Sequence, residues 1–350
     1  MPGTAPQPPI FAVAALVPYV LILLGVTFGG FWSIAVLFYM AVLTAIMDQI
    51  LRLAAPNSAE GSEFPAADGV LVLIACMHFT AFPLVVWAIA GNSGFATWEH
   101  VVLAIGAGQW FGQVANPCAH ELIHRGNRGL YWLGVAIYAS MLFGHHASAH
   151  RLVHHRFAAT LDDPNTAREG ESYYRFWLRA WVGSYMAGLR AETARRQGKG
   201  LHPYAVYAAI SVFCLCFGYV IGGWGGVLAW MALAIFGHSQ LLLADYVQHY
   251  GLLRKTRSNG TPEPVSERHS WNAPHWFTST LSLNAPRHSD HHAHPSRAYP
   301  ALSLPEKGAA PYLPLPLAMC CNIALVPRLW YRVIAKPLNR WRVQEEAWRE

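Results

Sequence analysis

Charged residues are scarce in this sequence. Only 13% of its 350 residues are Asp, Glu, Lys or Arg, whereas 54% are hydrophobic. A soluble globular domain carries about 25% charged residues, so the composition indicates an integral membrane protein. The six cysteines form neither a disulfide framework nor a zinc-binding spacing, and we interpret them as small buried side chains. The net charge of +6 comes mainly from loops beside apolar runs, which favours membrane topology over nucleic-acid binding.

The pattern of a cleavable signal peptide is also lacking. The residues before the first apolar run include no Lys or Arg, and the run itself continues past the length of a signal sequence. We therefore expect this run to be a membrane span.

Six apolar runs are each long enough to cross a membrane, which takes about 20 helical residues. They pair into three hairpins whose short connections, near residues 29–30, 91–97 and 222–226, contain no Lys or Arg. The opposite loops and the C-terminal region are basic, so the positive-inside rule places these loops and both termini in the cytoplasm. We expect one all-α domain over residues 1–350 in the cytoplasmic membrane, with spans at about 10–29, 31–51, 69–90, 98–118, 203–222 and 225–246.

A further apolar run, Leu130 to Phe143, is too short to cross. We expect a re-entrant, interfacial or protein-buried helix there. If this run did cross, the histidines before it and after it would lie on opposite sides of the membrane and could not share a site.

Histidine is unusually frequent, with 18 residues against 19 for Asp and Glu together. The histidines gather in the predicted cytoplasmic segments 119–202 and 247–302. On a helix, residues three or four apart share a face, and imidazole is the commonest metal-ligating side chain. The best-placed rings are those of His120, His124, His150, His154, His155, His249, His288, His291 and His292.

Nine rings are too many for one tetrahedral ion, so we predict two metal ions with four or five nitrogen ligands each. Imidazole suits zinc, copper, iron and nickel, so the ligand type alone does not choose the metal. A basic surface that contacts lipid headgroups is the alternative without a metal. Carboxylates should orient the ligand rings, and the candidates are Glu121, Asp162, Asp163, Asp245 and Asp290.

The other histidines have different expected roles. Those near the clusters but off their best faces, His145, His146 and His294, we interpret as structural or as partners of the ligands. His78 and His238, within spans, should be hydrogen-bonded helix residues or should line a cavity. The remaining ones are expected in loops or at the membrane interface: His100, His202, His269 and His275.

Two other functions fit parts of this pattern. His120-Glu-Leu-Ile-His124 satisfies H-E-x-x-H, the zinc metalloprotease pattern in which the Glu is the general base, but this leaves at least six other clustered histidines unexplained. A metal transporter should hold its ligands within the spans, near the middle of the membrane.

At these residues the chain resembles the integral-membrane alkane hydroxylases, the alkane 1-monooxygenase family within the larger histidine-rich membrane desaturase and hydroxylase group. The matching motifs, with two that extend them, are His120 to His124, Gly144 to His155 with Asp162-Asp-Pro, Asp245 to Leu252, Arg287 to His292, Ser270-Trp-Asn272 and Pro295 to Tyr299. The resemblance implies a non-haem site of two iron ions. It also implies that one oxygen atom of O2 enters a terminal C–H bond of a hydrocarbon, while the other leaves as water.

The resemblance further implies an external source of two electrons. In this family the donor is rubredoxin with its NADH-dependent reductase, whereas the related xylene-type hydroxylases use a ferredoxin-type flavoprotein reductase. This chain has no four-cysteine rubredoxin motif and no Gly-rich dinucleotide fingerprint, so the donor must be a separate protein. A basic cytoplasmic surface would suit an acidic carrier. Related desaturases, ketolases and alkylbenzene hydroxylases are the nearest alternatives.

The sequence departs from the family pattern at several positions. Ala149 stands where Glu is common, Asp245 and Gln248 stand where Asn and Glu are usual, and Ala285-Pro286 replaces Leu-Gln. No proposed ligand is lost, but the altered carboxylates weaken any transfer of substrate preference.

A hydrocarbon channel is a further hypothesis. The predicted ligands follow the ends of apolar helices, so we expect the spans to enclose an apolar channel that opens to lipid. Its candidate lining residues are Phe31, Trp32, Phe38 and Tyr39, for which a lipid-facing or packing role is the alternative.

Overall fold

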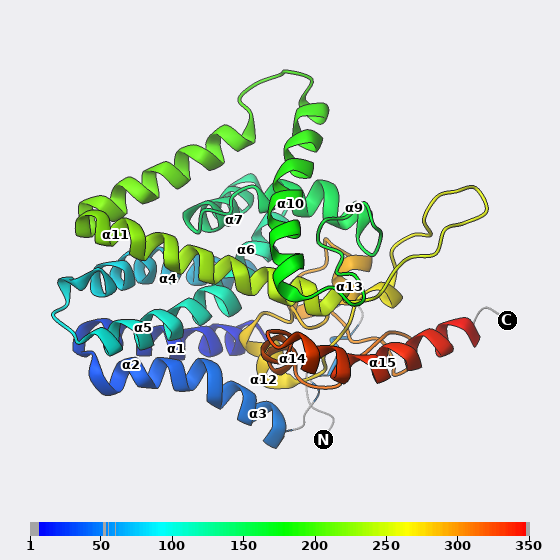
Figure 1. The fold of residues 1–350 in the computed structure, drawn as a ribbon, viewed down its shortest axis with the longest axis horizontal. Helices are drawn as coiled ribbons and strands as arrows, with labels where there is room; N and C mark the ends of the chain where they lie inside the picture. The colour runs from blue at the N-terminus through cyan, green and yellow to red at the C-terminus, as the bar shows by residue number, and fades with distance from the viewer. Residues whose placement is uncertain (1–6, 52–53, 55, 60, 348–350) are drawn as a thin grey trace.

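The computed structural model describes residues 7–51, 54, 56–59 and 61–347, and every regular element in this part of the chain is a helix (Figure 1). Extended backbone is limited there to isolated bridges such as that between Asn272 and Tyr312. The predicted all-α fold is therefore confirmed.

The first helical hairpin turns at a pair of glycines. Helix α1 (Pro8–Phe28) is followed by α2 (Gly30–Leu37), the π-helix η1 (Phe38–Leu43) and α3 (Thr44–Leu51). Gly29 has φ 60°, and a Cβ there would lie 2.6 Å from Oε1 of Glu99, so only glycine fits this turn.

The second hairpin joins α4 (Ala67–Trp87) and η2 (Ala88–Asn92) to α5 (Thr97–Trp110). Helix α5 continues through η3 (Phe111–Ala115) into α6 (Asn116–Ile123), which carries the first histidine pair. The third hairpin lies within α11 (Pro203–His249), whose helical geometry breaks at Gly222 and Gly223. Its two arms are in close contact, because a Cβ on Gly226 would lie 2.0 Å from the carbonyl oxygen of Gly218.

Four helices are long and apolar enough to cross a membrane: Pro8–Phe28, Gly30–Leu51, Ala67–Asn92 and Pro203–His249. The length and the apolar composition of these helices therefore indicate an integral membrane protein. The break at Gly222 and Gly223 divides the last of these helices into two of the predicted spans. The predicted span at 98–118, in α5, η3 and α6, is not among the four, so the six-span layout stays a prediction.

The short apolar run forms α7 (Arg128–Ser140), a helix of 13 residues. The side chain of Asn127 caps its N-terminus by accepting hydrogen bonds from two backbone amides. Helix α7 packs closely against α6, since a Cβ on Gly134 would lie 2.8 Å from the carbonyl oxygen of Ala119. The half of α7 from Gly134 to Ser140 is mostly buried in the protein, whereas Trp132 in the other half is 37% exposed.

The remaining elements surround the histidine-bearing end of the bundle. The short helices α8 (His146–Ala149), η4 (His150–His154) and α9 (His155–Phe157) precede α10 (Tyr173–Arg196), which lies across the direction of α11 (Figure 1). After α11 the chain forms η5 (Glu267–His269), α12 (Trp276–Leu281), α13 (His288–Ala293), η6 (Tyr299–Ala301), α14 (Leu317–Ala324) and α15 (Pro327–Ala347).

The aromatic residues suggested for a channel are not all inside the bundle. Phe31 is 71% exposed and Phe38 is 49% exposed, so both face outward. Trp32 and Tyr39 are partly buried, and the ring of Tyr39 lies 6.3 Å from that of Phe277 in α12. For Phe31 and Phe38 the structure favours the lipid-facing alternative.

Candidate metal centre

The structure brings all nine predicted ligand histidines into two adjacent groups. Within each group, one ring nitrogen from every member lies within 4.8 Å of those of all the others. Between the groups, the ring centroids of His155 and His292 are 4.8 Å apart. The five-histidine group consists of His120, His124, His150, His155 and His291, and the four-histidine group consists of His154, His249, His288 and His292.

Local helix geometry decides which group each ring joins. His120 of α6 and His124, which caps the C-terminus of this helix, lie one turn apart, so both face the five-histidine group. In the π-helix η4, hydrogen bonds run between residues five apart. Residues at that spacing therefore come onto nearly the same face. His150 and His155 accordingly join the five-histidine group, while His154 joins the other.

Helix α13 contributes to both groups. His288 and His292, one turn apart, join the four-histidine group, whereas His291 joins the five-histidine group. The N-terminus of this helix is held by Asn272, whose Oδ1 accepts hydrogen bonds from the backbone amide and the hydroxyl of Ser289, at 3.2 and 3.0 Å. The position of α13 between the groups is therefore fixed by a contact with another segment.

The spacing of the ring nitrogens fits two bound ions. Two nitrogens about 2.1 Å from one ion, at about a right angle, are about 3.0 Å apart. The close Nε2–Nε2 contacts in the structure have this length: His120–His150 2.8 Å, His150–His155 2.9 Å, His155–His291 3.1 Å, His249–His288 3.0 Å and His288–His292 3.1 Å.

Unpaired nitrogens point to the same conclusion. Nε2 of His124 and Nε2 of His154 are buried and have no hydrogen-bond partner among the described residues. Such a buried polar atom costs about 1–3 kcal/mol unless it is satisfied. A metal ion in each group would satisfy both nitrogens, so the residues present fit the predicted ions.

Burial keeps most of these rings neutral. Removal from water, together with the neighbouring rings, lowers the pKa of His120 to about 3. Burial and neighbouring rings, with nearby arginines at His124 and His155, lower the pKa well below its ordinary value at His124, His150, His155, His288, His291 and His292. Neutral imidazole is the form that binds a metal, so these pKa shifts favour the ligand role.

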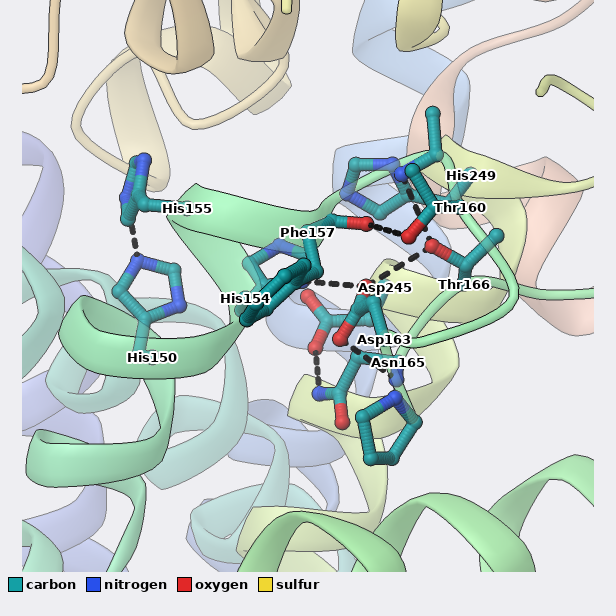
Figure 2. Close-up of polar contacts among 12 residues, drawn as sticks. His150, His154, His155, Phe157, Thr160, Asp163, Asn165, Thr166, Asp245 and His249 are labelled. Carbon is teal, nitrogen blue, oxygen red and sulfur yellow. Dashed lines mark hydrogen bonds and ion pairs between the residues drawn. The ribbon is translucent and has the colours of Figure 1, made fainter. Parts of the chain in front are cut away.

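Asp163 orients one ring of the four-histidine group. Its Oδ2 accepts a hydrogen bond of 2.9 Å from Nδ1 of His154, as Figure 2 shows, and a second from the hydroxyl of Thr166. Burial alone would lower the pKa of His154, but the carboxylate outweighs it and the pKa is raised. With the proton held on Nδ1, the Nε2 lone pair is free to bind an ion.

The other predicted carboxylates lie near the site but bond elsewhere. Asp245 accepts a hydrogen bond of 2.7 Å from the side chain of Asn165 (Figure 2). The backbone amide of Asn165 in turn donates to Oδ1 of Asp163 at 3.0 Å. Asp290 is fully buried, but it binds His294, Arg297 and the backbone amide of Ser303, and so organises the loop after α13. Asp162 is exposed and does not reach the site.

Glu121 lies beside the five-histidine group without bonding to its rings in the described part of the chain. It accepts hydrogen bonds from Arg125 and from the backbone amide of Tyr299, at 3.2 and 3.1 Å. Burial raises its pKa to about 7. A zinc protease needs this carboxylate at the metal as a general base, so its position does not support the protease alternative.

His249 has a different kind of support. Its Nδ1 lies 3.5 Å from the hydroxyl of Ser270, and its ring also bonds to the backbone of His269. Trp271, which follows Ser270 in the sequence, donates from Nε1 to the carbonyl oxygen of Tyr250 at 2.9 Å. The Ser270-Trp-Asn272 motif thus fixes both the end of α11 and the start of α13.

The histidines outside the nine have structural contacts. Nε2 of His78 lies 2.8 Å from the hydroxyl of Ser140, and Nδ1 of His238 lies 3.4 Å from the carbonyl oxygen of Met141. His146 lies 5.1 Å, between ring centroids, from His150, and His145 lies against Phe143. Their expected hydrogen-bonded or structural roles are consistent with these positions.

A third set of potential ligands, Glu263, His269 and Glu345, has the wrong protonation for a metal. The backbone amide of Ser266 donates to Nδ1 of His269 at 3.0 Å. The ring proton must then be on Nε2, which donates to Glu263 at 3.3 Å. His269, expected in a loop or at the membrane interface, is therefore a buried residue that links Ser266 to Glu263 and not a ligand.

Several positions that depart from the family pattern are explained by packing. The side chain of Gln248 donates to the carbonyl oxygen of Ala285 at 3.0 Å, so two of these positions contact each other. Ala149 is 3% exposed, and a Cβ on Gly188 of α10 would lie 3.0 Å from its side chain. A glutamate at position 149 would therefore not fit without moving α10.

Sequence reasoning missed Arg287 as a residue of the site. This arginine precedes His288 and is 1% exposed. Its guanidinium donates to the carbonyl oxygen of Leu302 at 2.6 Å, to Oδ1 of Asn57 at 2.9 Å and to the carbonyl oxygen of Pro56 at 3.4 Å. An arginine directly before a ligand motif was the available signal, but its partners are distant in the sequence.

Asp163→Asn should lower metal affinity at the four-histidine group by about 10–100-fold, because a neutral amide replaces the charged carboxylate that accepts from Nδ1 of His154 and fixes its ring. Metal titration of the purified, metal-depleted protein would measure this. Asp162→Asn is the matched control, since that side chain is exposed. Equal affinity in the two variants would contradict the role of Asp163.

Comparison with known proteins places this geometry in a family. Residues 96–318 match the model of the fatty acid desaturase family. The chain is 32% identical over 271 residues to an alkane 1-monooxygenase of Pseudomonas putida, in an alignment that covers 75% of this chain and 65% of the relative. It is 27% identical over 339 residues to alkane 1-monooxygenase 2 of Pseudomonas aeruginosa, covering 92% of this chain and 88% of the relative.

A third relative is named for a different activity. The chain is 30% identical over 236 residues to the xylene/toluene monooxygenase hydroxylase component XylM of Pseudomonas putida, covering 64% of this chain and 61% of that protein. The chain spans 65% of the length of several of the curated alkane 1-monooxygenases that it matches.

Proposed function

The chain belongs to the fatty acid desaturase family, and on that basis we propose that it is a membrane di-iron monooxygenase that hydroxylates the terminal carbon of an alkane or similar hydrocarbon. One observation carries the proposal: nine buried histidines converge in a group of five and a group of four beside the ends of apolar helices. The similarity to alkane 1-monooxygenases supports the choice of reaction and of iron.

The nine imidazoles would hold two iron ions, which when bound would supply the activation of O2. The chain's own residues perform the other tasks. Asp163 holds a proton on Nδ1 of His154, so that Nε2 faces the group. Burial excludes water from the rings, and Glu121 ties α6 to the backbone at Tyr299.

The proposal includes a six-span topology with the metal centre and both termini in the cytoplasm. The break in α11 and the continuous helical path from α5 to α6 support six crossings. The tight connections without Lys or Arg would lie on the opposite side of the membrane. A hydrocarbon dissolved in the membrane would then approach the centre from the apolar side.

The reaction needs a partner protein. Inserting one oxygen atom of O2 into a C–H bond and releasing the other as water consumes two electrons and two protons. A separate one-electron carrier, a rubredoxin or a ferredoxin-type protein with its reductase, would supply the electrons in two transfers. This chain would contribute the metal centre and the docking surface.

A methyl group on an aromatic ring is the second candidate substrate. The similarity to XylM supports it, because that relative is named as a xylene/toluene monooxygenase component. The two candidates share the metal centre and differ in the hydrocarbon that is accepted and in the carrier that supplies the electrons.

The test is hydrocarbon oxidation under ¹⁸O2 by membranes that contain the chain, with either reduced rubredoxin and its reductase or a ferredoxin-type flavoprotein reductase as the electron source. We expect a primary alcohol that carries one ¹⁸O atom, from an n-alkane or from the methyl group of xylene. Membranes with a His288→Ala variant are the control for background oxidation. An alkene, a ketone or an alcohol labelled only from water would contradict the proposal.

A further inference from the structure

The exposed face of helix α15 carries a regular row of positive charges. Arg328, Arg332, Lys336 and Arg340 are spaced four residues apart, and all four are exposed. Residues at this spacing lie above one another on a helix. None of these side chains forms an ion pair within the described part of the chain. We refer to these four residues as the α15 ridge.

The opposite face of α15 is fixed in the protein core. Trp330, Ile334, Leu338 and Trp341 are at most 5% exposed. A Cβ on Gly251 would lie 2.8 Å from the side chain of Leu338, so the helix packs closely on the segment after α11. The helix that carries the ridge is therefore packed on the protein along one face, and the ridge side chains project from the other face.

This packing distinguishes the ridge from a membrane-binding helix. An amphipathic helix on a membrane surface inserts its apolar face into the lipid. In α15 that face is already buried in the protein, and the helix extends away from the bundle on the side where α13 lies (Figure 1). The free face carries the four charges together with two exposed apolar side chains, Leu329 and Val343, and this predominance of charge fits a protein with a negative surface better than a bilayer.

The ridge also lies beside a short route to the metal centre. The ring of Trp330 is 5.4 Å, between centroids, from that of Tyr250, in an edge-to-face contact. Tyr331 stacks on the same tyrosine, with centroids 6.4 Å apart. Tyr250 follows His249 of the four-histidine group directly in the sequence. Aromatic rings thus lead from α15 to the residue that follows His249, and no such contact leads from α15 to the five-histidine group within the described part of the chain.

We propose that the α15 ridge is the docking surface for a small acidic electron carrier, and that electrons enter through the four-histidine group. This inference rests on the proposed function, which requires a separate carrier. Each docked carrier gives up one electron and is itself oxidised. Two such transfers, with two protons, balance the conversion of O2 and a hydrocarbon into an alcohol and water.

The test compares two double charge reversals. K336E/R340E changes the ridge, whereas R190E/K199E changes the net charge equally on α10 and the loop after it, where both residues are also exposed. Each purified protein, in nanodiscs of zwitterionic phosphatidylcholine, is tested for binding to immobilised rubredoxin at about 20 and 200 mM salt.

We expect the wild type and the R190E/K199E variant to bind rubredoxin with rate constants that fall steeply with salt. The K336E/R340E variant should associate about tenfold more slowly at low salt, with a weaker salt dependence, because steering acts on the association rate. Its KM for rubredoxin should rise correspondingly, while turnover with dithionite and methyl viologen as reductant should be unchanged.

Equal association rates in the two variants, or no binding of rubredoxin to the wild type, would overturn the docking surface. Ridge-dependent binding to vesicles of phosphatidylserine without binding to rubredoxin would overturn it in favour of an anionic lipid surface. Failure of the proposed function is separate from these results, because it would show as no hydroxylation by the wild type even with the small-molecule reductant.

Discussion

Replacing His288 or His291 by alanine should abolish hydroxylation, and the two variants should lose different metal ions. His288 belongs to the four-histidine group and His291 to the five-histidine group, although they lie three residues apart on α13. Losing a residue that only orients a ligand costs about 10–100-fold, so loss of a ligand should cost more than about 100-fold. Each variant should bind less iron than the wild type.

Iron content per chain and product formation, measured on the same preparations, would check this result. His294→Ala is the matched control, because His294 lies in the same segment, but its ring bonds to Asp290 and lies outside both groups. Full iron content in the His288→Ala and His291→Ala variants would be incompatible with their assignment as ligands.

Arg287→Leu should destabilise the segment that carries α13 by about 3 kcal/mol. The guanidinium is buried and donates to Leu302 and Asn57, and hydrogen bonds from a charged donor contribute about 1.5 kcal/mol or more each. Its loss leaves a buried carbonyl oxygen without this partner. Because His288 is the next residue, the variant should also bind iron less tightly.

Thermal unfolding in detergent and iron content would measure the two effects of Arg287→Leu. Arg287→Lys should fall between this variant and the wild type, since a lysine keeps the charge but cannot reproduce the planar set of donors. Arg257→Leu, at an exposed position, is the surface control. The account of Arg287 is wrong if the Arg287 and Arg257 variants unfold at the same temperature.

Much of the architecture could be predicted because it depends on local sequence. Apolar runs separated by Gly29-Gly30 or by the glycines near residue 222 predict helical hairpins, and the structure turns at those positions. The run at 130–143 was short, and the structure forms a helix of only 13 residues there. The nine histidines could be selected because their spacings place them near one another on short helices.

The division of the histidines between two groups could not be predicted in the same way. An ordinary α-helix would place His154, four residues after His150, nearest to it. The π-helix η4 instead brings His155 to His150 and sends His154 to the other group. Such a change in hydrogen bonding within one turn has no clear sequence pattern, and it depends on the surrounding packing.

The roles of the carboxylates depend on contacts between distant segments. Glu121 bonds to the backbone of Tyr299, and Asp290 bonds to the loop after its own helix. Asp162 and Asp163 are adjacent, yet one is exposed and the other is 1% exposed and bonded to His154. Only the fold determines which carboxylate meets a ring.

The most direct test of the central claim is metal analysis of the purified chain. Two irons per chain are predicted, because the histidines form two groups, each suited to one ion. Zinc in stoichiometric amount, with no iron, would contradict a di-iron monooxygenase.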